Sequence, residues 1–152
     1  MKGLITIITL FTLTNCIANT DSTEILNYWL TDTEEYIVQI YEENGVYKGK
    51  IVWLLNPLAM DGEARRDVMN NEPELRSRLL MGLDVLDGFE YDDGDWRHGS
   101  VYNFKNGNDY NAHLKIDNDG NLRWTGYYGI LFFLGKTKVW TPVSDLKKYG
   151  LK

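Results

Sequence analysis

Five strand-like runs follow one another in the second half of the chain, and Asp, Asn and Gly residues separate most of them. The runs span residues 83–91, 96–104, 110–116, 122–128 and 133–141. The turn signals between them are Asp92-Asp93-Gly94, Asn106-Gly107 and Asn118-Asp119-Gly120. Turn signals spaced about every 8–12 residues are typical of antiparallel sandwiches and barrels. This rhythm predicts an all-β fold.

Three further strands are expected upstream, in residues 25–30, 36–41 and 46–54, with Glu43-Asn44-Gly45 as a tight hairpin turn. About eight strands is the number that closes a barrel with room for side chains or one small ligand. Closure also removes exposed sheet edges. We therefore expect an antiparallel up-and-down β-barrel rather than a sandwich. Gly49, Gly99 and Gly126 lie inside strands, where glycine marks bends or close approach.

Alternation predicts which side chains face the core. It groups Trp96, Tyr102 and Phe104 on one face, with His98 between them and directed inward beside Trp96. The even-numbered residues of 110–116 and 122–128 are mostly apolar and are expected inside. The odd-numbered residues 111, 113 and 115 are polar and are expected to face water.

One stretch, residues 55–80, lacks this alternation and is here called the excursion. It is longer than an ordinary loop, and loops of this length are usually functional or disordered. Asn71, Pro73 and Glu74 together indicate the start of a short helical turn. We expect an ordered excursion with a short helix, packed against one end of the barrel.

The N-terminus is typical of an export signal. A lysine at position 2 precedes an apolar core at residues 4–13, which is too short to span a bilayer. Two cleavage positions compete: a lipoprotein signal would end before Cys16 and lipidate it, whereas an ordinary peptidase would cut after Ala18. Residues 1–18 are thus expected to be a signal peptide, and residues 19–152 a single domain in the periplasm or anchored in the bacterial cell envelope as a lipoprotein.

Composition excludes several classes of function. The formal charge is −6, which argues against nucleic acid and against anionic membrane surfaces, so that membrane contact is expected only through a lipid anchor. A lone cysteine forms no disulfide within the chain. Two histidines without a cysteine pair give no zinc signature, and the acidic turns fit no calcium loop. We expect no metal and no cofactor, and we find no nucleophile motif that favours an enzyme.

Several sequence blocks carry a family resemblance. They include the stretches at residues 47–54, 56–62 and 75–78, then Gly99-Ser100-Val101-Tyr102, Gly126-Tyr127-Tyr128-Gly129 and residues 134–140. In these blocks the chain resembles the exported bacterial domain-of-unknown-function family 2147. The resemblance implies a lipocalin-like β-barrel and no established activity. Many family members have arginine where this chain has Thr125 and Lys136.

Candidate ligand-binding residues come from an arginine cluster and an aromatic set. Four of the six arginines lie in the excursion, and Arg76 and Arg78 are the candidates for an anionic head group, since guanidinium groups clamp carboxylates. Local ion pairs with neighbouring acids, Asp67 among them, are the structural alternative. The aromatic candidates are Tyr102, Tyr110, Trp124 and Tyr128, which either line a ligand cavity or fill the core.

Two functions are favoured by these residues, and a third, an enzyme, would need inward-facing titratable groups clustered in one pocket, such as His98 beside a carboxylate. The first is an envelope protein that binds a small hydrophobic or anionic amphipathic ligand, such as a fatty acid, in the barrel. The second is a solid-cored interaction module that uses its surface or the excursion to bind an envelope protein or polysaccharide. A filled barrel would favour the second.

Overall fold

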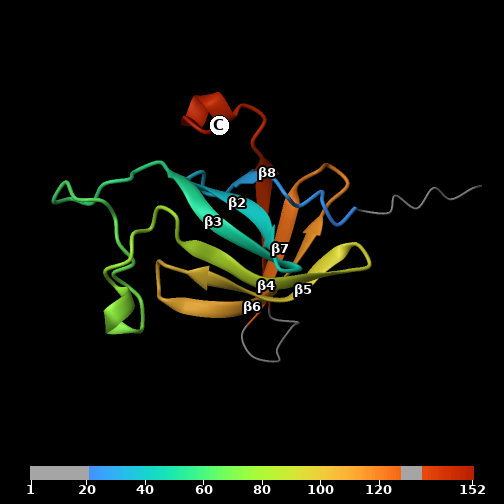
Figure 1. Ribbon diagram of the computed structural model, residues 1–152, viewed down its shortest axis with the longest axis horizontal. Helices are drawn as coiled ribbons and strands as arrows, with labels where there is room; N and C mark the ends of the chain where they lie inside the picture. The colour runs from blue at the N-terminus through green and yellow to red at the C-terminus, as the bar shows by residue number, and fades with distance from the viewer. Residues whose placement is uncertain (1–20, 128–134) are drawn as a thin grey trace, which may run out of the picture.

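The computed structural model describes residues 21–127 and 135–152 and shows eight antiparallel strands closed into a barrel (Figure 1). The strands are β1 (Tyr28–Leu30), β2 (Tyr36–Glu43), β3 (Val46–Leu54), β4 (Asp84–Asp92), β5 (Asp95–Asn103), β6 (Asn108–Ile116), β7 (Leu122–Tyr127) and β8 (Lys136–Pro142). Each pairs with its sequence neighbour, and β1 closes the ring by pairing with β8 through Leu30 and Thr141. The predicted up-and-down barrel is confirmed.

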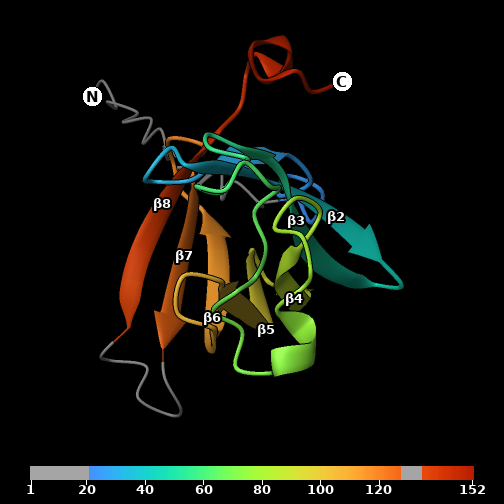
Figure 2. The ribbon, with the colours of Figure 1, turned by 90° about the vertical axis from the view of Figure 1, so that its left-hand side faces the viewer.

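The two ends of the barrel differ. Tight turns join β2–β3, β4–β5 and β6–β7 at one end, called the hairpin end (Figure 1). Asn44 and Gly45 have φ of 55° and 83°, and Asp93 and Gly94 have φ of 48° and 89°, the positive values that a two-residue hairpin turn needs. Longer connections, including the excursion, gather at the opposite end, called the loop end, which Figure 2 views from outside.

The barrel interior holds the hydrophobic core. Its largest fully buried side chains include Trp29, Trp96, Trp140 and Phe89. Glycine makes this packing fit: a Cβ at Gly99 would lie 2.4 Å from the Phe89 ring, well inside van der Waals contact. The expectation that in-strand glycines mark close approach is therefore confirmed at this position.

A bulge in β5 corrects the predicted face of that strand. The register between β5 and β6 shifts between Trp96 and Gly99, and His98 at the bulge has φ of 66°. The extra residue reverses the alternation, so Val101 is buried and His98 is exposed. The placement of His98 inside, and of Tyr102 on the same face as Trp96, was wrong. The outward residues 111, 113 and 115 and the inward Ala112 and Leu114 are confirmed.

The excursion is ordered by its own backbone pairing. Arg66 and Leu79 form an antiparallel bridge, and the amide of Leu80 donates to the carbonyl of Arg65 at 2.9 Å. The predicted helical turn is present as the 3-10 helix η1 (Pro73–Leu75). Its N-cap is Glu72, without a side-chain cap bond, and Pro73 is its first residue.

Asn71 joins the excursion to the barrel, because its side-chain amide donates to the carbonyl of Gly107 at 2.7 Å. A second 3-10 helix, η3 (Leu146–Tyr149), ends the chain, and Tyr149 packs edge-on against Trp53 with ring centroids 4.9 Å apart. Within residues 21–127 and 135–152, no helix has the length and apolar character needed to cross a membrane. The predicted signal peptide at 1–18, with Cys16, and also Tyr128, lie outside the described residues.

Candidate ligand-binding site

The loop end of the barrel contains a cavity of about 470 Å³, here called the calyx. Strands β2, β5, β6, β7 and β8 supply its walls, and the β1–β2 and β5–β6 connections supply part of its rim. The residues that line it are Asp32, Thr33, Tyr36, Val101, Tyr102, Asn103, Lys105, Asn106, Tyr110, Trp124, Gly126, Tyr127, Lys136, Lys138 and Trp140. The barrel is thus filled toward the hairpin end and hollow toward the loop end.

The calyx has an aromatic wall. Trp124 and Trp140 meet edge-to-face with ring centroids 6.1 Å apart, and Tyr36 lies 6.4 Å from Trp140 in the same geometry. Burial raises the pKa of Tyr36, so this side chain is a neutral phenol under physiological conditions. Gly126 leaves room beside the indole, since a Cβ there would lie 2.7 Å from the Trp124 ring. Such a wall suits an apolar ligand body.

Three lysines line the calyx, while Asp32 is the only carboxylate among its lining residues. Lys138 pairs with Asp32, and Lys105 pairs with Glu35 outside the lining. The hydrogen bond from Lys105 holds the pKa of Glu35 below its ordinary value. Lys136 is exposed on β8 opposite Gly126. The calyx therefore combines an aromatic wall with excess positive charge, although the whole chain is acidic.

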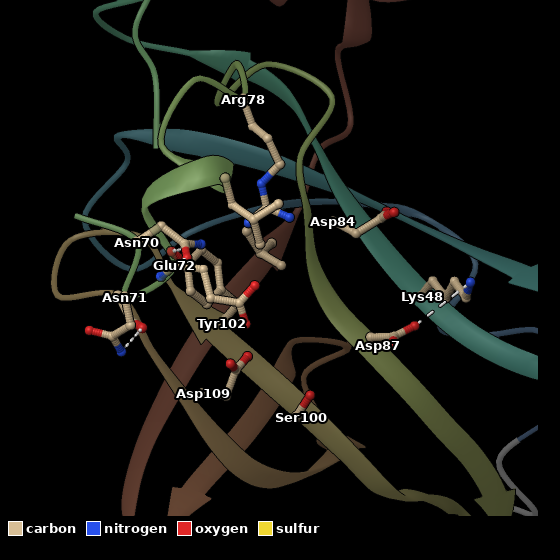
Figure 3. Close-up of a pocket in the computed structure, with 13 residues that line it drawn as sticks. Lys48, Asn70, Asn71, Glu72, Arg78, Asp84, Asp87, Ser100, Tyr102 and Asp109 are labelled. Atoms are coloured by element: carbon tan, nitrogen blue, oxygen red, sulfur yellow. Dashed lines mark hydrogen bonds and ion pairs between the residues drawn. The ribbon is translucent and has the colours of Figure 1, made fainter. Parts of the chain in front are cut away.

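A second hollow of about 490 Å³, here called the outer groove, lies between the excursion and the outer side of β3–β6 (Figure 3). Its lining is polar and includes Arg78, Ser100, Tyr102 and Asp109. Burial raises the pKa of Asp109 from its ordinary value. Of the residues that the structure describes, Tyr102 is the one that lines both the outer groove and the calyx.

An ion pair between a buried carboxylate and a partly exposed guanidinium lies beside the outer groove. The side chain of Asp67 is fully buried and accepts from Arg78 Nη2 at 2.8 Å, from Tyr102 Oη at 2.7 Å and from Asn70 Nδ2 at 2.8 Å. Burial and the hydrogen bond to Asp67 raise the pKa of Tyr102 to about 12. The structural alternative considered for the arginine cluster, a local ion pair, is present at Arg78.

The structure brings together some of the residues singled out in the sequence and separates others. Tyr102, Tyr110 and Trp124 share the calyx. Arg78 lines the outer groove with Tyr102. Arg76 is in neither lining, and its Nε donates to the carbonyl of Asn70 at 2.7 Å.

The calyx lysines were missed in the sequence. Lys136 and Lys138 lie four and two residues before Trp140 on β8. Residues two apart in a strand face the same side of the sheet, so strand alternation alone could have placed all three on the inner face. Lys105 sits in a β5–β6 connection and gave no comparable signal. Among the described residues, no three His, Cys, Asp or Glu side chains are grouped to hold a metal ion.

Taken together, a closed eight-stranded antiparallel barrel with almost no helix and a hollow loop end defines a lipocalin-like protein. Comparison with known proteins agrees. The chain belongs to the family DUF2147, described as an uncharacterized protein conserved in bacteria, which matches residues 27–142.

One solved structure is similar over most of the chain. It is described as "Protein HP1028 from the human pathogen Helicobacter pylori belongs to the lipocalin family". The similarity has a TM-score of 0.71 and 26% sequence identity, and it covers 84% of this chain and 90% of that chain. No curated protein matches the sequence.

Proposed function

We propose that this protein binds a small amphipathic molecule with an anionic head group in the calyx, and that it does so in the bacterial cell envelope. The observation that carries the proposal is the joining of an aromatic wall and three lysines in one cavity of about 470 Å³. Small-molecule sites are typically concave, mostly apolar and of about 300–1,000 Å³, with a few polar groups that fix orientation. The lipocalin fold of the similar structure supports the same class of ligand.

The lysines give the ligand a direction. An apolar chain is stabilised against Trp124 and Trp140 because its burial contributes about 0.8 kcal/mol per CH₂ group. The head group then lies at the rim, close to Lys136 and Lys138. On β8, Lys136 pairs with Gly126 of β7, and Lys138 pairs with Trp124. Asp32 holds Lys138 in the absence of ligand, and an incoming carboxylate would share or replace that contact.

The test compares a charged ligand with a neutral one of the same chain length. Dodecanoate and dodecanol are titrated against the mature domain while displacement of the fluorescent dye anilinonaphthalenesulfonate is followed. We expect the double variant Lys136→Ala and Lys138→Ala to weaken dodecanoate by about tenfold, equivalent to about 1.4 kcal/mol, and to leave dodecanol unchanged.

The matched control is Lys115→Ala, which removes an outward-facing lysine on β6. This control is expected to bind both ligands as the wild type does. Equal loss of both ligands in the double variant, or loss in the control, would reject the head-group assignment. Failure of the wild type to bind either ligand would reject the calyx as a site for such molecules.

The envelope location rests on the sequence of residues 1–18, with an apolar core of signal-peptide length before Cys16. Lipidation at Cys16 and cleavage after Ala18 are separated by one labelling experiment. Cells that express the full chain or its Cys16→Ser variant are labelled with palmitate. Label on the full chain but not on the variant supports a lipid anchor, whereas an unlabelled, shortened chain in the periplasm supports ordinary cleavage.

A second candidate function follows from the surface of the excursion. Nearly all the large hydrophobic side chains that the described residues expose belong to the excursion or directly follow it. They are Leu55, Leu58, Met60, Val68, Met69, Leu79 and Met81. Such a concentration favours docking of an envelope protein. If this is the main function, replacing Leu58 and Met60 by serine would abolish capture of a partner without changing dodecanoate affinity.

A further inference from the structure

The fully buried carboxylate of Asp67 has three donors, and they come from two parts of the molecule. Arg78 and Asn70 belong to the excursion, whereas Tyr102 belongs to β5 of the barrel. A buried carboxylate is unfavourable unless it is paired and hydrogen-bonded. The position of the Tyr102 hydroxyl is therefore tied to the position of the excursion.

Tyr102 also belongs to the calyx. Among residues 21–127 and 135–152, it alone lines both the calyx and the outer groove. Its hydroxyl receives a second bond from Asn70 Nδ2 at 2.9 Å, and the Arg78 guanidinium carbon lies 6.0 Å from the centre of its ring. Three excursion residues thus hold one residue of the cavity lining, and Figure 3 shows Asn70 and Arg78 on the same side of Tyr102.

We infer that Asp67 is a positioning residue for the calyx. By holding Tyr102, it couples ligand binding in the calyx to the state in which the excursion is packed on the barrel, here called the seated state. The inference rests on the proposed function, since it requires a ligand in the calyx. A ligand that packs against seated Tyr102 favours the seated excursion. By thermodynamic linkage, the seated excursion must then raise the affinity for that ligand by the same factor.

The excursion holds its own shape through internal backbone bonds, including Asp67 N to Arg78 O at 2.9 Å. Its contact with the barrel depends on side-chain hydrogen bonds, such as those of Asp67 with Tyr102 and of Asn71 with Gly107. The Nε of Arg78 is buried and has no hydrogen-bond partner among the described residues. An unmade bond of this kind lowers the stability of the seated state, and locally unstable segments are the ones that ligands reorder.

Two variants separate positioning from simple anchoring. Tyr102→Phe removes the hydroxyl that Asp67 accepts from and keeps the ring. Asn71→Ala removes a second side-chain link between excursion and barrel, the bonds from Asn71 Nδ2 to the Gly107 carbonyl and to Asn108 Oδ1, and touches neither Asp67 nor Tyr102. Both variants loosen the excursion, but only the first releases the calyx residue. Asp67→Ala is avoided because it would leave Arg78 unpaired.

The experiment measures two quantities in the folded mature domain. Hydrogen exchange is followed at the amides of Asp67, Asn70 and Leu80, and the dissociation constant is measured for anilinonaphthalenesulfonate. In the wild type we expect the dye to slow exchange at these amides by about 5-fold, a typical allosteric coupling. In Tyr102→Phe we expect the dye to bind about 5-fold more weakly and to lose its effect on exchange. In Asn71→Ala we expect faster exchange, unchanged dye affinity and an undiminished dye effect.

The outcomes distinguish this inference from the proposed function. If the wild type binds the dye but Tyr102→Phe and Asn71→Ala behave alike, or if the dye leaves exchange unchanged, the coupling is refuted and the calyx site stands. If the wild type does not bind the dye, both are refuted.

Discussion

The substitution Gly126→Ala tests whether the ligand of the calyx lies against Trp124. An alanine Cβ at Gly126 would lie 2.7 Å from the Trp124 ring, about 0.7 Å inside the 3.4 Å limit of ordinary contact. Trp124 is only partly buried and lines the calyx. The indole can therefore relieve the contact by tilting into the cavity. Gly126→Ala should change the calyx more than it changes the fold.

The expected magnitudes follow from this geometry. Because the ring has space to move, the free energy of unfolding should fall by about 1 kcal/mol or less, below the usual cost of overpacking. The methyl group and the tilted ring would displace about two methylene groups of a bound chain. At about 0.8 kcal/mol for each, this amounts to about 1.6 kcal/mol, or more than a tenfold loss of affinity.

Gly99→Ala is the matched comparison with the opposite expected result. Its Cβ would lie 2.4 Å from the ring of Phe89, which is fully buried between strands and has no cavity to move into. Unfolding free energy should fall by about 2–3 kcal/mol, at the upper end of overpacking costs. Neither Gly99 nor Phe89 lines the calyx, so the folded variant should bind dodecanoate normally.

Both variants are assayed by urea denaturation with tryptophan fluorescence and by dye displacement with dodecanoate. The account predicts a stable, weakly binding Gly126→Ala and an unstable, normally binding Gly99→Ala. Full dodecanoate affinity in Gly126→Ala would refute the placement of the ligand against Trp124. A Gly99→Ala protein as stable as the wild type would refute the packing argument.

Three further predictions concern other parts of the fold. Asp117 accepts the amides of the β6–β7 turn, which lowers the pKa of its carboxyl. Asp117→Ala should destabilise the protein by about 0.5–1.5 kcal/mol, the net contribution of a typical hydrogen bond, because water can reach the turn. The Asp117 contribution to wild-type stability should be lost as the pH falls below its ordinary range near 3.8, and urea titrations at several pH values check both expectations. The folded pKa of Tyr102 is raised to about 12 from 10.0, so its stabilising contribution is present below pH 10 and should be lost as the pH rises toward 12. The pKa values of Tyr36 and Tyr41 are raised too, so ultraviolet titration of Tyr102→Phe should show one late tyrosine fewer than the wild type, and an unchanged titration curve would contradict this. Trp53→Ala should release the C-terminal turn that packs through Tyr149, seen as faster trypsin cleavage near the C-terminus and no change in dodecanoate affinity.

The barrel was predictable because its signals are local. Alternation and positive-φ turn residues such as Asn44-Gly45 depend only on neighbouring positions, and they gave the strand count and the hairpins. The bulge at His98 was not predictable, since one added residue changes the face of every following side chain without altering composition.

The site was predictable only in part, because it is assembled from distant segments. Strand alternation placed Tyr110 and Trp124 inside, and both line the calyx. Tyr102 also lines the calyx, although the bulge in β5 overturned the face that alternation predicted for it. The hydrogen bond between Asp67 and Tyr102 joins residues 35 positions apart, and nothing in the sequence marks that pairing. The arginines are conspicuous because four of the six lie in one segment, whereas two of the three lysines that line the cavity lie on β8 with ordinary strand spacing.

The central claim is that the calyx holds an amphipathic anion, and native mass spectrometry tests it most directly. The protein is purified gently from cells that produce it, alongside its Gly126→Ala variant. The account predicts a discrete added mass on the wild type, lost on denaturation, carrying an acidic group and reduced or absent on the variant. A wild-type preparation with a clean unliganded mass that also fails to bind added dodecanoate would contradict it.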